Sequence, residues 1–193
     1  VMLPGIMAEG LMLLVGQKKV AHKTWFMLQA AAQLSAGNEM LRAKPPGPMP
    51  VAVFALEEGG TVLDKHGNEA PALDVVCNRL KAMMLYDIAA KHNVRFFLEL
   101  PPLQSGGLES IESAAREHKV IFIDSRAMIF NEAADTEKNI WLRDYKQLQP
   151  IKDIARRNHI CIVVITHTSK DSDMREAIDS GNATGGTDAA VDG

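Results

Sequence analysis

Four short runs of apolar residues, rich in β-branched side chains, constrain the fold of this chain more than any other feature. They occupy residues 11–15, 51–56, 120–123 and 161–165. Each run is apolar throughout instead of alternating with polar residues, which is typical of strands that are covered on both faces. A fifth run, residues 96–100, is weaker. Continuous runs of this kind predict a parallel sheet between two layers of helices.

The stretches between these runs have the spacing of helices. Apolar residues recur three and four positions apart in residues 24–36, 73–91, 108–118 and about 142–158. Strands and helices therefore alternate, and the crossovers are long enough for right-handed βαβ units. We predict an α/β fold with a mostly parallel central sheet. A polar insertion at residues 59–71 predicts a small hairpin.

Length and composition set the outer limits of the prediction. The chain has 193 residues, of which 47% are hydrophobic, so we expect residues 1–193 to form a single domain. Its net charge of −3 excludes a globally basic surface of the kind that binds nucleic acid by bulk electrostatics. No apolar run reaches the roughly 20 residues of a membrane span. The two cysteines are far apart and form no metal motif, which fits a reducing cytoplasm.

A candidate phosphate site follows the first apolar run. Gly16 opens the segment GQKKVAHKT, and Thr24 begins an amphipathic helix. A strand, a tight loop and a helix N-terminus bind anions because free backbone N–H groups and the helix dipole point to one place. The P-loop pattern G-x-x-x-x-G-K-[ST] is not met, because Ala21 holds the second glycine position and His22 the lysine position. The Lys23–Thr24 pair falls one residue late.

Two conformations of this loop are compatible with the sequence. If the loop bulges by one residue, Lys23 meets phosphate and Thr24 meets Mg²⁺, while Ala21 and His22 crowd the backbone approach to phosphate. If the loop keeps its register, His22 replaces the lysine and the site loses its permanent charge at neutral pH. We favour the bulge, because a Lys-Thr pair followed by an apolar helix is the simpler match. The alternative to both conformations is that this segment is an ordinary lysine-rich turn with no role in binding phosphate.

Polar residues also follow the other three runs. Glu57 ends the second run, Asp124 closes the third, and His167 follows the fourth. The carboxyl ends of parallel strands meet at one crevice, so we expect these side chains to surround one ligand. There, Glu57 can polarise an attacking water, and Asp124 can hold Mg²⁺ directly or through water. His167 is a candidate sensor of the γ-phosphate.

The order of these segments resembles the RecA-like ATPases that include the RepA-type hexameric replicative helicases of plasmids and phages. The similarity covers nearly the whole chain. It rests on LPGIMAEGLMLLVG, VAVFALEE, NRLKAM, VIFIDS, RDYKQLQPIKDIARRNHICIVVITHTSK and GNATGGTDAAVD.

This resemblance implies a site and a set of partners. Carried over by position, Gly16, Ala21 and His22 belong to the nucleotide loop, Lys23 meets phosphate, and Thr24 and Asp124 meet Mg²⁺. Glu57 is then the catalytic carboxylate and His167 the sensor. The family binds ATP between the subunits of a homo-oligomeric ring, takes an arginine finger from the neighbour, and moves single-stranded DNA through the ring. Its last strands would lie after Gly193, so we expect this chain to lack them.

Three functions remain open at this stage. The first is an ATP-binding and ATP-hydrolysing domain of a DNA-replication helicase or related DNA motor. The second is a catalytically impaired RecA-like scaffold in assembly or regulation, in which the irregular loop does not support hydrolysis. The third, a small-molecule kinase, has little support. Residues 169–193 favour a mobile loop, and they weaken a DNA contact because they carry six acidic side chains against two basic ones.

Overall fold

The core of the described chain is a five-stranded parallel sheet with the strand order β1-β7-β6-β2-β5. The computed structural model describes residues 2–17, 21–58, 61–63, 69–130 and 140–168. The strands are β1 (Gly10–Gln17), β2 (Val51–Ala55), β5 (Arg95–Phe97), β6 (Val120–Asp124) and β7 (Cys161–Thr168). The α/β fold and the parallel sheet predicted from the apolar runs are confirmed.

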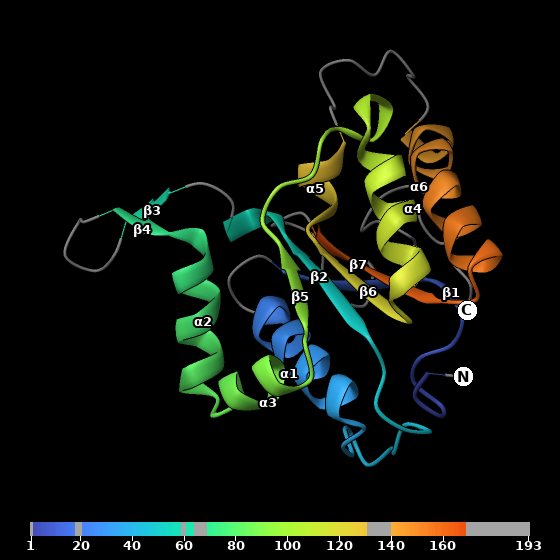
Figure 1. The fold of residues 1–193 in the computed structure, drawn as a ribbon. Coiled ribbons are helices and arrows are strands. Elements are labelled where there is room, and N and C mark those ends of the chain that lie inside the picture. The colour runs from blue at the N-terminus through green and yellow to red at the C-terminus, as the bar shows by residue number, and fades with distance from the viewer. Residues whose placement is uncertain (1, 18–20, 59–60, 64–68, 131–139, 169–193) are drawn as a thin grey trace.

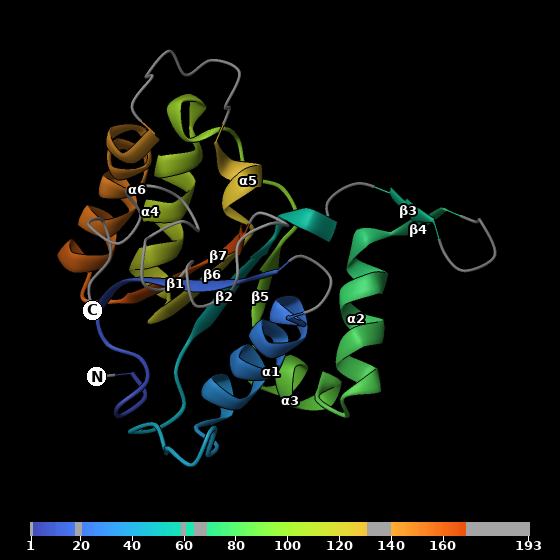
Figure 2. The ribbon, with the colours of Figure 1, turned by 180° about the vertical axis from the view of Figure 1, so that it is seen from behind.

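Helices cover both faces of the sheet (Figure 1). One layer contains α1 (Lys23–Ala36), α2 (Ala72–Ala82) and α3 (Tyr86–Lys91), and the other contains α4 (Gly107–Glu117) and α6 (Ile140–Arg157). Figure 2 shows the same two layers from behind, with α2 standing farthest from the sheet. The short helix α5 (Arg126–Ile129) follows β6, and the 3₁₀ turns are η1 (Leu56–Glu58) and η2 (Leu103–Ser105).

The two helical layers explain why the strands are apolar without alternation. Successive side chains of a strand point to opposite faces, so each strand needs apolar residues for both layers. In β6, Val120 and Phe122 pack in the core beneath α1, whereas Ile121 and Ile123 pack in the core beneath α4 and α6. These four side chains are at most 1% exposed. Burial of such a side chain contributes about 1.5–3 kcal/mol, so β6 is held from both faces of the sheet.

The helix predicted for residues 73–91 is wrong in one respect, because the chain forms two helices there. The first helix ends at a reversal in which Met84 has a left-handed backbone, with φ of 56°. The Leu85 N–H donates to Leu80 O, and the Met84 N–H donates to Lys81 O. This is the geometry of a Schellman cap, usually formed around glycine. A methionine at this position does not predict such a cap from the sequence. The turn allows Leu85 to pack in the core beneath α1.

The remaining elements differ from the prediction in smaller ways. The fifth strand is Arg95–Phe97 and not residues 96–100, because its pairing with β2 spans only Ala52–Phe54. The predicted hairpin is present as the antiparallel pair β3 (Thr61–Leu63) and β4 (Glu69–Pro71). The tail at 169–193 lies outside the described residues. No described helix is long and apolar enough to cross a membrane.

Candidate functional site

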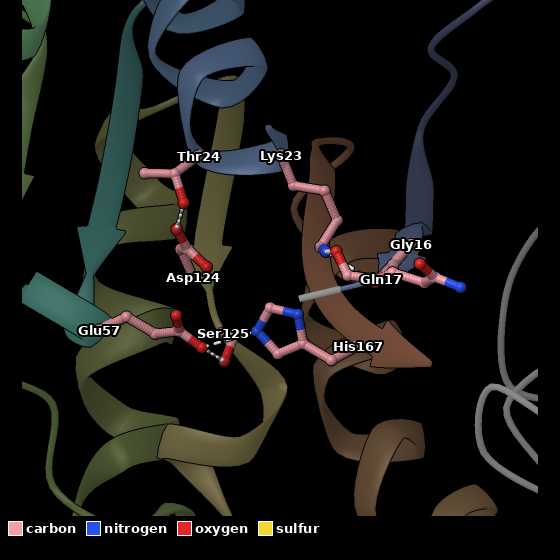
Figure 3. A network of polar contacts seen from close by, with 8 residues as sticks. All are labelled: Gly16, Gln17, Lys23, Thr24, Glu57, Asp124, Ser125 and His167. Carbon is pink, nitrogen blue, oxygen red and sulfur yellow. Dashed lines mark hydrogen bonds and ion pairs between the residues drawn. The ribbon is translucent and has the colours of Figure 1, made fainter. Parts of the chain in front are cut away.

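The polar side chains predicted for the site converge at one end of the sheet. Lys23 and Thr24 come from the first turn of α1, Glu57 from the turn after β2, Asp124 from the end of β6 and His167 from β7. Figure 3 shows these side chains facing one another across the strand ends. This is the position of ligand crevices in parallel sheets, because all the strands end at the same edge.

The phosphate loop ends at His22, the residue before α1. His22 is exposed and has a left-handed backbone, with φ of 45° and ψ of 32°. Its side chain makes no capping hydrogen bond to the helix, and α1 starts at Lys23. A P-loop has glycine before its lysine, and glycine adopts this conformation at no steric cost. The helix α1 therefore begins with Lys23 and Thr24, and His22 occupies the position directly before it.

Lys23 is folded back onto the end of β1. Its ammonium donates hydrogen bonds to Gly16 O at 2.7 Å and to Gln17 O at 3.0 Å, and the residue is only 6% exposed. The Ala21 N–H also donates to Gln17 O, at 3.4 Å. The positive end of the helix dipole lies at the N-terminus and favours an anion there. Hydrogen bonds from an ammonium to an anion are also stronger than those to neutral carbonyls, so a bound anion can replace the two carbonyl oxygens as the partner of Lys23.

Gly16 has little room for a side chain. A Cβ built on Gly16 would lie 2.8 Å from Ala21 Cβ and 3.5 Å from Lys23 Cδ. The Ala21 side chain therefore fills the space that a residue larger than glycine would need, whereas Lys23 would be in ordinary van der Waals contact. Residues 18–20, the middle of this loop, lie outside the described part of the chain.

Thr24 and Asp124 form the second contact of the site. Thr24 Oγ1 donates a hydrogen bond to Asp124 Oδ2 at 2.6 Å, and Asp124 is 1% exposed. A hydroxyl beside a buried carboxylate fits Mg²⁺, which binds through one or two carboxylates and takes its remaining ligands from water and phosphate. The described residues contain no group of three or more His, Cys, Asp or Glu side chains that could hold a metal by themselves.

Glu57, Ser125 and His167 form the third contact. Glu57 Oε1 accepts one hydrogen bond from Ser125 Oγ and one from His167 Nε2, each at 2.7 Å. The side chains of His167 and Glu57 are 20% and 22% exposed, so they lie at the rim of the crevice. Two donors on one oxygen hold the carboxylate in a defined orientation.

The structure brings together all the charged and hydroxyl residues that the strand ends suggested. Gly16 and His167 are register partners in the neighbouring strands β1 and β7, so the carbonyl that binds Lys23 lies beside the strand residue that carries the His167 side chain. Ser125 ends the segment VIFIDS, and no pattern in the sequence predicted a role for it. Its only signal is a small polar residue directly after the strand-ending Asp124.

Comparison with known proteins gives a family match and two structural similarities. The family described as "AAA domain" matches residues 2–173. A solved structure described as an ATPase domain has a TM-score of 0.63 and 14% identity over 96% of this chain and 68% of that chain. The crystal structure of the RadB recombinase has a TM-score of 0.50 and 18% identity over 89% of this chain and 67% of that chain. No curated protein matches. These similarities confirm the expected RecA-like P-loop fold.

Proposed function

Because the chain belongs to the AAA domain family, we propose that it is an ATP-binding and ATP-hydrolysing domain of a DNA-replication helicase or related DNA motor. The observation that carries this proposal is the hydrogen bond from Thr24 to Asp124. It joins the first turn of α1 to the acidic end of a central strand. These are the two protein groups that a P-loop ATPase uses around its Mg²⁺.

Each side chain of the site has a place in the proposed reaction. Lys23 exchanges the carbonyls of Gly16 and Gln17 for phosphate oxygens. Thr24 and Asp124 hold Mg²⁺, which supplies positive charge against the phosphates. Glu57 orients a water and accepts its proton. The water oxygen forms a bond to the γ-phosphorus, and the bond to the β–γ bridging oxygen breaks with its electron pair leaving on ADP.

His167 is proposed to sense the γ-phosphate. Its Nε2 lies on Glu57, and its Nδ1 is buried without a hydrogen-bond partner among the described residues. Exchange of Glu57 for a phosphate oxygen would move the end of β7, because His167 is its second last residue. The segment after β7 would then report the state of the nucleotide. We propose that the domain acts on single-stranded DNA within a homo-oligomeric ring, whose neighbouring subunit completes the site with an arginine.

The first experiment measures nucleotide binding and turnover in the full chain with Mg²⁺. ATP at 100 times its Kd should stabilise the protein by about 2.7 kcal/mol. The Lys23→Ala variant should lose this stabilisation, whereas Glu57→Gln should keep it and retain only slow residual hydrolysis. Lys91→Ala and Glu117→Gln are matched controls, because both residues are exposed and lie at the ends of other helices. Stabilisation by ATP that Lys23→Ala leaves unchanged would contradict the proposed site.

A second candidate function follows from the irregular loop. Ala21 fills the space beside Gly16, and His22 holds the position that glycine takes in a P-loop. Both features favour a catalytically impaired scaffold for assembly or regulation. That function predicts no stabilisation by ATP and no turnover. Stimulation of turnover by single-stranded DNA would support the motor instead, and turnover that DNA leaves unchanged would count against it.

A further inference from the structure

We propose that Ser125 is the positioning residue that keeps Glu57 in place when His167 turns to the nucleotide, a role that rests on the proposed ATPase activity. Glu57 Oε1 accepts hydrogen bonds from Ser125 and from His167, and the second of these is the proposed sensor. When His167 turns to a phosphate, Glu57 loses the hydrogen bond from His167 Nε2. Of these two donors, Ser125 is then the one that remains on the oxygen.

The sheet itself sets the distance between Ser125 and Glu57. β2 and β6 are neighbours, and Ala55 pairs in register with Asp124. Ser125 follows Asp124 directly, and Glu57 lies in the turn that begins after Ala55. The Ser125 hydroxyl reaches Glu57 Oε1 at 2.7 Å, within the range of a hydrogen bond to a carboxylate. The same short segment of chain therefore presents Asp124 to Thr24 and Ser125 to Glu57 (Figure 3).

The local role that a serine usually has at this position is not the one observed. Ser125 is the N-cap residue of α5, where a serine hydroxyl ordinarily accepts a hydrogen bond from the backbone of the first turn. Within the described residues the hydroxyl makes no such capping bond, and it donates to Glu57 instead. The short helix gives up a cap that would stabilise it. Capping of α5 therefore does not explain why a hydroxyl-bearing residue stands at position 125.

Burial separates the two donors of Glu57. Ser125 is 0% exposed, whereas the His167 side chain is 20% exposed at the rim. Ser125 is fully buried directly after the central strand β6, so its hydroxyl has little freedom to move toward a ligand. The rim histidine can exchange partners. This difference assigns the fixed contact to Ser125 and the exchanging contact to His167.

The test compares Ser125→Ala and Ser125→Thr with the parent chain in the ATPase assay. Removal of the hydroxyl should lower kcat roughly tenfold, because a small displacement of a reacting group has a large effect on rate. KM should stay within about twofold, because Ser125 does not contact the nucleotide in this proposal. Threonine keeps the hydroxyl and should retain most of kcat. Ser35→Ala is the matched control, since Ser35 is also buried and donates one hydrogen bond, to Ala32 O in α1.

The Glu57→Gln background makes the test specific. If Ser125 acts through Glu57, then Ser125→Ala should not lower single-turnover hydrolysis further in that background. Equal kcat in the parent and Ser125→Ala, or an undiminished effect in the Glu57→Gln background, would overturn the role while leaving the ATPase proposal intact. Failure of the parent chain to bind ATP would overturn both. Melting temperatures of the Ser125 variants close to that of Ser35→Ala exclude general misfolding as the cause.

Discussion

Replacement of Gly16 by alanine is expected to destabilise the protein, because the phosphate loop occupies the space its side chain would need. The new Cβ would lie 2.8 Å from Ala21 Cβ, 3.5 Å from Lys23 Cδ and 3.7 Å from Lys23 Nζ. Ala21 Cβ is bonded directly to the backbone, so the loop itself must move. Overpacking of this kind costs about 1–3 kcal/mol. Each kcal/mol lowers the Tm of a domain of this size by roughly 2–4 °C.

The assay is urea and thermal unfolding of four variants. Ala21→Gly removes the atom that the new side chain meets, so the Gly16→Ala/Ala21→Gly double variant should recover most of the loss. The coupling energy between the two substitutions should be about 1–3 kcal/mol, although the second glycine itself costs up to about 1 kcal/mol. Gly47→Ala is the matched control, because a Cβ there would meet nothing within 4 Å.

Two results would refute this account of the loop. One is a Gly16→Ala variant as stable as Gly47→Ala, which would mean that the loop yields without cost. The other is a double variant whose loss equals the sum of the two single losses, which would mean that Ala21 is not the obstacle. If Ala21 does pack beside Gly16, then Ala21→Gly should also open space in the loop next to Lys23. The Ala21→Gly variant should then bind ATP at least as tightly as the parent chain, which can be measured on the same samples.

Three further predictions concern other parts of the molecule. Thr24→Val should lose the hydrogen bond to Asp124 and about 1.5–3 kcal/mol of stability by urea unfolding, while Thr24→Ser should keep both. Phe122→Ala should lose about 3–5 kcal/mol in the same assay, because Phe122 is 1% exposed, and a near-neutral result would contradict the core packing. Burial raises the pKa of the Cys161 thiol to about 12, so a thiol reagent should modify the half-buried Cys77 first in the folded protein. Above pH 9 the thiol of Cys161 ionises in the unfolded chain but stays protonated in the folded protein. The free energy of unfolding should therefore fall as the pH rises from 9 to 12. In the Cys161→Ala variant this fall should be smaller.

Much of the fold could be predicted from local patterns. Residues 120–123 and 161–165 lie in β6 and β7, because continuous apolar runs of β-branched residues need cover on both faces. The helix after the phosphate loop was placed within one residue of its observed start at Lys23. The break at Met84 was missed, because its left-handed backbone depends on packing and not on a residue that prefers it.

The candidate site was predictable only in part, for the same reason. Glu57, Asp124 and His167 could be placed at one edge because parallel strands end together. The sequence favoured Lys23 over His22 only through the Lys-Thr pair at the start of an apolar helix, and it did not predict that the Lys23 ammonium bonds to the carbonyls of Gly16 and Gln17.

The sequence by itself determined which segments are strands and helices and which end of the sheet carries the polar residues. Those features follow from local propensity and burial, which act along the chain. Only the tertiary structure decided which side chains touch. The Ser125 hydroxyl reaches Glu57 across 68 positions, and Thr24 reaches Asp124 across 100. Contacts of this kind depend on strand order and register, and a residue's neighbours in the sequence carry no information about them.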